Sequence, residues 1–455
     1  MSSVIRGLLS SALVLAALTY PLLGPASGAD GDISDYRLEN GLRVYVVEKH
    51  STPIAAVQIW YRTGSVNERP GIRGLSHLFE HMMFRGSERF GPGEHFQRIA
   101  EVGGTNNAFT ADDVTCYEQV VPVDAVDLVM EMEADRMTRL KLDEEMLRTE
   151  REVVKEEYRV NFENSPFSSL LIALAAEYFG EHPYGYGVIG DMDDLDTVSV
   201  ATCEAYYRSR YAPNNATLIV AGDVDPDGVL EAAERRFGSI APSDTIAPDP
   251  PAPPQSDRRE MRATAGLPVP LTGIVYRLPP DGDPDALALE VFGKALSDRL
   301  DAALTRDSSL CIQTEVFDQE YRQLHLFGVI GAHFPNVPAD KVRRAIESEI
   351  VQMLSEPMAL SELNATRNSM LLDETLRRTR VEAIAEDLGN ALLIAQTPAC
   401  YTARLDRLAE LTPNAVVEAA RRHFTRENRT DVVIEPNSTP LMVKLAGWFA
   451  TAFGL

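Results

Sequence analysis

The chain has 455 residues, of which 45% are hydrophobic and 24% are charged. That balance is typical of a globular protein and excludes a disordered, collagenous or coiled-coil chain, and the length predicts two or three domains. The 68 acidic side chains outnumber the 43 basic ones, giving a formal net charge of −25. Because phosphate contacts need a basic face, this charge argues against a nucleic-acid partner and against docking on an anionic membrane.

The first 29 residues have the pattern of a secretory signal peptide. Arg6 precedes an apolar run over 8–23, and the small residues Ser27 and Ala29 fit cleavage before Asp30. The alternative is a retained membrane anchor. No later segment offers about 18 uncharged apolar residues, so we expect no stable membrane insertion after removal of the signal. The mature protein is therefore expected to be exported, with the periplasm as its destination.

The remaining chain divides at a proline-rich stretch. We expect a first domain over 30–240, a linker over 241–257 and a second domain over 258–455. The elements expected in the first domain are strands over 42–47 and 54–61, helices over 75–84 and 143–161, a strand over 217–223 and a helix over 225–237. Those expected in the second are helices over 285–295, 339–354, 360–393 with breaks, and 413–423.

A weak internal repeat links the ends of the two domains. In each, a helix ending in an aromatic residue is followed by an asparagine turn and a β-branched strand. The matching pairs, at one constant offset, are Tyr211 with Phe424, Asn215 with Asn428, and Thr217 with Thr430. The repeat predicts two related α+β domains. The four cysteines, Cys116, Cys203, Cys311 and Cys400, contain no CxxC pair and are expected to be small buried side chains.

The strongest chemical signal is His77-Leu-Phe-Glu80-His81. On a helix, His77, Glu80 and His81 share one face, and two imidazoles four residues apart are spaced to hold one metal ion. The helix is apolar nearly all round, so it is expected to be buried, and buried polar groups need partners. The alternative is a surface helix that carries these side chains by chance.

A tetrahedral catalytic zinc site needs a third protein ligand. On the helix expected over 143–161, Glu150 and Glu157 fall among the apolar residues Met146, Leu147, Val153 and Val154. Buried carboxylates are normally paired or bound to metal, so both are candidate ligands. The geometry alone does not choose between them, and a buried salt bridge is the alternative for each.

The run over 64–86, with its His77–His81 motif, closely resembles the pitrilysin/insulinase metallopeptidases, whose zinc motif is the inverted H-x-x-E-H. The resemblance implies an α+β fold of two homologous domains, each a mostly antiparallel sheet packed with helices, forming half of a clam-shell peptidase. It further implies one zinc ion per chain, with Glu157 as the third ligand and Glu150 supporting the site. The segment 103–110 resembles the family's edge strand, which implies that Asn107, Ala108 and Phe109 bind substrate.

These features predict a secreted zinc endopeptidase acting on peptides or unfolded segments. Glu80 would be the general base, and the substrate would pair as an added strand. A second hypothesis is a non-proteolytic assembly or scaffold subunit of the same fold, which the intact metal motif disfavours. A third is a metal-dependent hydrolase of non-peptide substrates.

The resemblance also implies a partner. In the family, the facing half supplies an Arg and a Tyr that bind substrate, in a segment of the form Leu-Arg-x6-Tyr. The matching segment here begins at Leu304 and carries Thr305 and Ile312 in their places. We therefore expect a heterodimer with a homologous subunit that carries the Arg/Tyr pair. The alternative is a different alignment, in which another pair serves.

Overall fold

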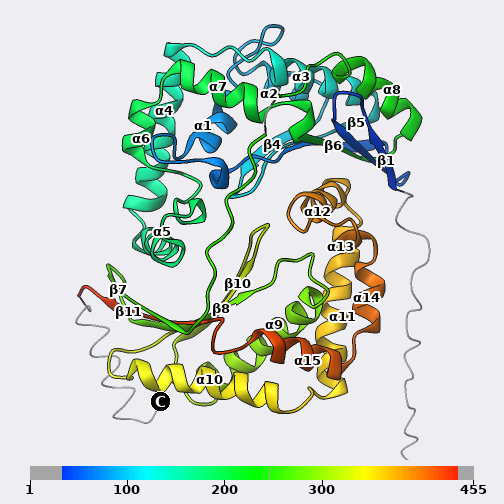
Figure 1. Cartoon of the computed structure of the whole chain (residues 1–455). Helices are drawn as coiled ribbons and strands as arrows, with labels where there is room; N and C mark the ends of the chain where they lie inside the picture. The colour runs from blue at the N-terminus through cyan, green and yellow to red at the C-terminus, as the bar shows by residue number, and fades with distance from the viewer. Residues whose placement is uncertain (1–32, 245, 439–455) are drawn as a thin grey trace, which may run out of the picture.

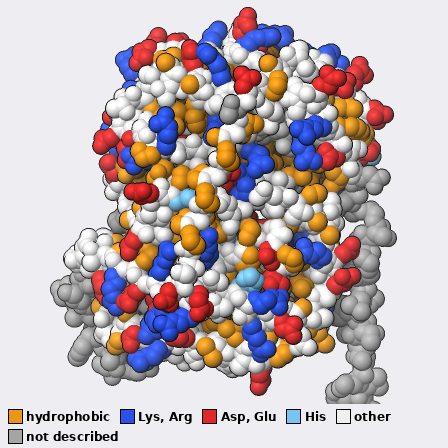
Figure 2. Space-filling model, in the orientation of Figure 1, with side chains coloured by type: hydrophobic (Ala, Val, Ile, Leu, Met, Phe, Trp, Pro, Cys, Tyr) orange, Lys and Arg blue, Asp and Glu red, His pale blue; other side chains and the backbone are white. Residues whose placement is uncertain are grey.

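The computed structural model describes residues 33–244 and 246–438, and the predicted signal peptide lies outside them. Two mixed β-sheets, each packed with helices, form an upper and a lower half in Figure 1. Within the described residues, no helix is long and apolar enough to cross a membrane. Acidic and basic side chains are interspersed over the face seen in Figure 2.

The first sheet has the order β1-β2-β6-β3-β5-β4. Neighbouring strands are antiparallel, except for β2 and β6, which run parallel. Its strands are β1 (Ile33–Arg37), β2 (Arg43–Glu48), β3 (Ile54–Tyr61), β4 (Thr105–Thr110), β5 (Thr115–Pro122) and β6 (Ala216–Gly222). β4 is an edge strand, as expected for the segment 103–110.

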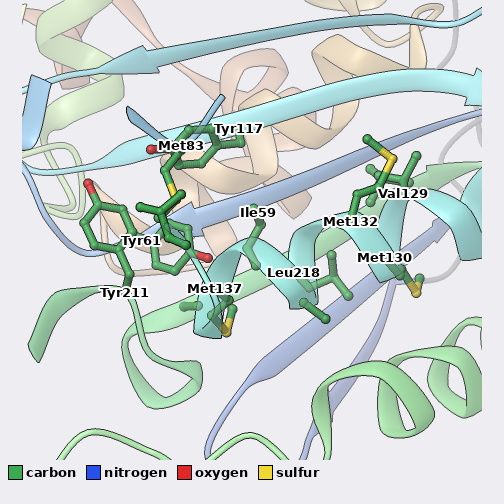
Figure 3. Packing of buried hydrophobic residues seen from close by; sticks show 14 of the residues in the cluster. Ile59, Tyr61, Met83, Tyr117, Val129, Met130, Met132, Met137, Tyr211 and Leu218 are labelled. Carbon is green, nitrogen blue, oxygen red and sulfur yellow. The ribbon is translucent and has the colours of Figure 1, made fainter. Parts of the chain in front are cut away.

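Helices of the same half pack on one face of this sheet, either directly or through one another, except for the helix over 166–179, which packs against the second sheet. These helices are α1 (Leu75–Met82), α2 (Glu94–Glu101), α3 (Val126–Thr138), α4 (Glu144–Tyr158), α5 (Pro166–Phe179), α6 (Met192–Thr197), α7 (Val200–Arg210) and α8 (Pro226–Phe237). Figure 3 shows Ile59 and Leu218 of the sheet beside Val129 and Met132 of α3, all in one buried cluster. Burying each such side chain stabilises the fold by about 1.5–3 kcal/mol.

The second sheet has the order β7-β11-β8-β10-β9, with only β7 and β11 parallel. Its strands are β7 (Arg259–Ala265), β8 (Leu271–Leu278), β9 (Gln313–Glu320), β10 (His325–Ala332) and β11 (Arg429–Pro436). The helices in this part of the chain are α9 (Ala286–Leu300), α10 (Ala339–Ser355), α11 (Leu360–Arg377), α12 (Val381–Leu393), α13 (Ala399–Thr402), α14 (Arg404–Glu410) and α15 (Pro413–His423). The predicted mixture of helices with two mostly antiparallel sheets is confirmed.

The internal repeat is visible in atomic detail. Asn215 donates from Nδ2 to the carbonyl of Arg210 over 2.7 Å, and Asn428 does the same to His423 over 3.0 Å. Each asparagine closes the turn between a helix, α7 or α15, and the strand that follows it, β6 or β11, which belongs to the one parallel pair of its sheet.

The two halves are joined by more than the chain. Helix α12 packs on the face of the first sheet opposite to α1, so closely that a Cβ on Gly389 would lie 2.3 Å from Trp60 Cε2. Figure 1 shows α12 between the two sheets. In the proline-rich stretch, residues 241–244 and 246–257 form no helix or strand, and His182 of the first half lies against it, with its Nε2 3.2 Å from the Pro250 carbonyl. All four cysteines are free, and only Cys400 is not fully buried.

Candidate metal centre

The helix that carries the histidines begins at a close backbone crossing. Gly74, at the N-cap of α1, has a φ of 89° and lies against Gly190, where a Cβ would come within 2.2 Å of Gly74 Cα. The buried carboxylate of Glu68 accepts hydrogen bonds from the backbone N–H groups of Gly74 (2.6 Å) and Ser76 (2.7 Å). Glu68 therefore satisfies the free amides of the first turn and fixes where α1 begins.

Three side chains from α1 and α4 converge. Nε2 of His77 lies 3.8 Å from Oε2 of Glu157, and Nε2 of His81 lies 3.5 Å from the same oxygen. One ligand atom from each of the three residues can be chosen so that all lie within 4.8 Å of one another. Helix α4 is itself fixed by Asp143, whose carboxylate caps it through the N–H of Met146 at 2.8 Å.

This donor set fits zinc. Two imidazole nitrogens and one carboxylate oxygen are ligands that zinc prefers, and three protein ligands leave a fourth position open. Zinc bonds of about 2.0–2.2 Å in a tetrahedron separate ligand atoms by about 3.3 Å, close to the separations found here. Burial, with His81 beside it, lowers the pKa of His77 to about 4. The neutral imidazole that results keeps its lone pair for a metal.

Glu80 lies next to this group on α1 and contacts the edge strand. Thr110, the last residue of β4, donates a hydrogen bond of 2.6 Å from Oγ1 to Oε2 of Glu80. Burial raises the pKa of Glu80, and the Thr110 hydrogen bond opposes that rise. A carboxyl group with a raised pKa both accepts and returns a proton more readily near neutral pH.

Glu150 lies behind the histidines. Its side chain is 1% exposed, its Oε2 lies 3.9 Å from Nδ1 of His81, and its Oε1 lies 2.6 Å from Nε of Arg85. The carboxylate therefore faces the ring nitrogen of His81 opposite to the one near Glu157. Glu157 itself is 36% exposed, at the margin of the buried face of α4.

The position of Val153 corrects one expectation. Its side chain is 39% exposed, because α4 buries Leu147, Glu150 and Val154 against the rest of the half and turns Val153 outward. The apolar stripe is therefore narrower than the sequence pattern indicates, and only one of its two carboxylates is fully buried.

The expected substrate residues lie on the edge strand. β4 is hydrogen-bonded to β5 on one side and has no strand of the described sheet on the other. Asn107 is exposed, Ala108 packs towards the α1 side of the sheet, and the Phe109 ring lies 5.4 Å from that of Trp60. The two residues expected to replace the Arg/Tyr pair lie in the second half. Thr305 is in a π-helical turn after α9, and Ile312, just before β9, is 44% exposed.

A second group in the described residues also has the spacing of a metal site: Asp283, Asp285 and His423. Here Asp285 already forms two hydrogen bonds with Arg422, of 2.6 and 2.8 Å. Arg422 therefore already compensates the charge of Asp285. In the α1–α4 group, by contrast, the ion pairs of Glu157 in the described residues are only those with the two imidazoles, so a cation is more needed there.

Comparison with known proteins places the chain in a family. Residues 43–192 match the model of insulinase (peptidase family M16), and residues 197–370 match that of the peptidase M16 inactive domain. The chain belongs to peptidase family M16. The second match begins before α7, so it includes the last strand of the first sheet as well as much of the second half.

The relatives found by sequence and the solved structures found by fold include proteases. The chain is 27% identical to the zinc protease PqqE of Helicobacter pylori, over 88% of this chain and 92% of that one. It is 30% identical to an uncharacterized zinc protease, YmxG, of Bacillus subtilis, over 46% and 50%. A crystal structure of a protease from Helicobacter pylori covers 89% of this chain and 100% of its own, at 25% identity and a TM-score of 0.83. The first half of the periplasmic protease PqqL of Escherichia coli shares the fold, at 18% identity and a TM-score of 0.75, over 93% and 95%.

Proposed function

We propose that the chain is a secreted zinc endopeptidase that hydrolyses peptides or unfolded protein segments, with one zinc per chain. The observation that carries the proposal is the convergence of His77, His81 and Glu157, with Glu80 beside them on the same helix. Membership of the M16 family and relatives named zinc proteases support it.

The chain's own residues account for the chemistry. His77, His81 and Glu157 would hold the ion. Bound there, zinc supplies a Lewis acid that polarises the scissile carbonyl and makes a water molecule easier to deprotonate. Glu80 accepts the proton of the attacking water on one carboxylate oxygen and returns it to the leaving amine, while Thr110 holds the other oxygen. Glu150 orients the ring of His81 through its Nδ1 side.

The substrate would lie along β4. An extended peptide adds a strand to a free sheet edge through main-chain hydrogen bonds, which read little sequence. Asn107, Ala108 and Phe109 would provide these contacts, a few residues before the Thr110 that holds Glu80. We therefore expect broad specificity for peptides that can adopt an extended conformation.

We further propose that the chain is the catalytic subunit of a heterodimer. Thr305 offers one short, uncharged hydroxyl and Ile312 no polar group, so neither can replace the charged donor fork of an Arg or the phenol of a Tyr. The complete periplasmic protease PqqL, which shares the fold at 18% identity, matches over 93% of this chain but only 50% of its own length, so that protein has room for two such units. The signal-peptide pattern over 1–29 supports export to the periplasm.

The test is metal analysis and peptide cleavage with the purified mature chain, alone and mixed with a homologous chain that carries the Arg/Tyr pair. The proposal predicts about one zinc per chain and cleavage of an unstructured peptide only in the mixture. Full activity of the chain alone would end the heterodimer part. A zinc-free chain that is inert in both settings would overturn the peptidase.

A further inference from the structure

We infer that Arg322, in the half that carries no metal ligands, is a positioning residue for peptide hydrolysis: it clamps the tip of the β4–β5 hairpin and so holds the edge strand and Thr110 against Glu80. This inference rests on the proposed peptidase function. It concerns a residue more than 160 positions away from the last metal ligand in the sequence and on the other sheet's β9–β10 connection.

Arg322 is 4% exposed and makes contacts with three separate segments. Its Nη2 donates to the backbone carbonyl of Asp113 (2.7 Å), its Nε to the carbonyl of Leu393 at the end of α12 (2.8 Å), and its Nη1 to Oδ2 of Asp249 in the linker (2.5 Å). Its backbone N–H also donates to Oδ2 of Asp113, over 2.9 Å. One side chain thus ties the hairpin tip, the linker and α12 together.

The tip of the β4–β5 hairpin comprises residues 111–114 and includes Asp113. Oδ1 of Asp113 accepts a further hydrogen bond from the hydroxyl of Tyr184, over 2.8 Å. Asp113 therefore has every carboxylate oxygen and its carbonyl engaged by groups outside the hairpin. Thr110, whose Oγ1 holds Glu80, comes directly before this tip and three residues before Asp113, so the position of the tip fixes the end of β4 at which the general base is held.

The same tip also reaches the start of α1. Asp112 accepts a hydrogen bond from Oγ of Ser65 (2.6 Å) and, at its carbonyl, from the N–H of Val66 (2.9 Å). The backbones are so close that a Cβ on Gly64 would lie 2.3 Å from the Ala111 carbonyl oxygen. Two residues beyond Val66 comes Glu68, which caps α1. The hairpin tip that Arg322 holds is therefore connected to α1 in two ways: through Thr110, which contacts Glu80, and through the segment 64–68, which ends in the cap of α1.

Stability alone is a weak reason for this arrangement. Burying an arginine and two carboxylates costs desolvation free energy, and well-packed apolar residues often stabilise a fold as much or more. What the Arg322 guanidinium adds is a set of directional hydrogen bonds, which hold the hairpin tip, the linker and α12 in one relative geometry. Catalysis depends on such geometry, since a displacement of about 1 Å caused by a distant mutation can lower a rate by about 100-fold.

The experiment compares steady-state kinetics of Arg322→Gln and Arg322→Lys in the complete enzyme, on an unstructured peptide, with zinc content and melting temperature measured for each. We expect kcat to fall by about tenfold or more in Arg322→Gln, with zinc content unchanged, and to recover in part in Arg322→Lys, which keeps one donor. The matched control is Arg404→Gln. Arg404 pairs with Glu290 at 2.7 Å and with Glu374 at 3.3 Å, wholly within the second half, so its loss should leave kcat within about twofold of wild type.

A double-mutant cycle keeps the test decisive if Arg322→Gln does not fold. Asp113→Asn, Arg322→Lys and the double variant should show non-additive effects on kcat, because the two side chains, 3.7 Å apart, hold the same hairpin tip against the β9–β10 connection. Additive effects, a wild-type kcat in Arg322→Gln, or a loss no larger than in Arg404→Gln at equal melting temperature would each overturn the inference. Failure of the proposed function has its own signature: if the wild-type enzyme cleaves the peptide no faster than Glu80→Gln does, the peptidase function and the role of Arg322 are both overturned.

Discussion

The two halves of the chain share one arrangement of strands and packed helices, but the corresponding helix pairs carry different side chains where they meet. In the first, α1 follows β3 and packs on α4; in the second, α9 follows β8 and packs on α11. The faces of α1 and α4 that meet carry His77, His81, Glu150 and Glu157. The buried positions of α9 are apolar, with Leu289, Phe292 and Leu296 among them.

The second half also has a buried acid at the corresponding helix, and its partners explain the difference. Glu374 of α11 is held by Arg378 (3.2 Å) and Arg404 (3.3 Å), so its charge is compensated within the half. On α4, the buried Glu150 has a comparable partner in Arg85, whereas the partly exposed Glu157 faces two imidazoles. The comparison teaches that the shared backbone arrangement does not by itself make the candidate metal site: the side chains on the two packed helices decide whether an acid faces imidazoles or arginines.

The largest effect should come from the three candidate ligands. Changing His77, His81 or Glu157 to Gln removes one of only three protein ligands, so we expect loss of zinc and of all peptide hydrolysis. Metal analysis by mass spectrometry and a peptide assay measure both, with Asp285→Gln of the second acidic group as the control that keeps its zinc. A Glu157→Gln protein with a full complement of zinc would remove that residue from the ligand set.

The next largest effect should come from Glu80, and it separates the role of the general base from that of the metal ligands. Glu80→Gln is nearly isosteric but cannot accept a proton, so kcat should fall by about 100- to 10,000-fold with zinc retained. Glu152→Gln, on the exposed side of α4, is the control for a neutral change nearby. Cleavage by Glu80→Gln at the wild-type rate would show that another group takes the proton.

A smaller effect is expected behind the histidines. Glu150→Gln should lower zinc affinity or activity by about 10- to 100-fold, because the carboxylate no longer orients His81. Competition with a chelator measures the affinity. An unchanged affinity together with unchanged kinetics would reduce Glu150 to a structural partner of Arg85.

An effect of similar size is expected at the contact between the sheet edge and α1. Thr110→Val keeps the shape of β4 but removes a hydrogen bond to a carboxylate, a contact whose free energy of about 1.5–3 kcal/mol corresponds to a loss in kcat of roughly tenfold or more. Thr105→Val, at the other and exposed end of β4, is the control. Equal kinetics in the two variants would mean that Thr110 does not position Glu80.

The sequence predicts the elements and the residues that face one another locally, since the spacing of His77, Glu80 and His81 and the periodicity of 143–161 are short-range signals. The asparagine turns at Asn215 and Asn428 are likewise readable because the same pattern occurs twice. What it does not predict are the cap that Glu68 makes on α1 from six and eight residues away, and two contacts between distant segments: Thr110 against Glu80, and Arg322 on the β4–β5 hairpin. The last two have no local pattern, because their partners lie 30 and 209 residues apart in the chain and meet only in the folded protein.

The central claim is that one zinc ion lies between α1 and α4 and that no equivalent exists in the second half. Anomalous diffraction from a crystal of the zinc-loaded protein, recorded on both sides of the zinc absorption edge, tests it most directly. We predict one anomalous peak per chain, bonded to Nε2 of His77, Nε2 of His81 and a carboxylate oxygen of Glu157. A peak at Asp283, Asp285 and His423 instead, or none at the α1–α4 group, would contradict the account.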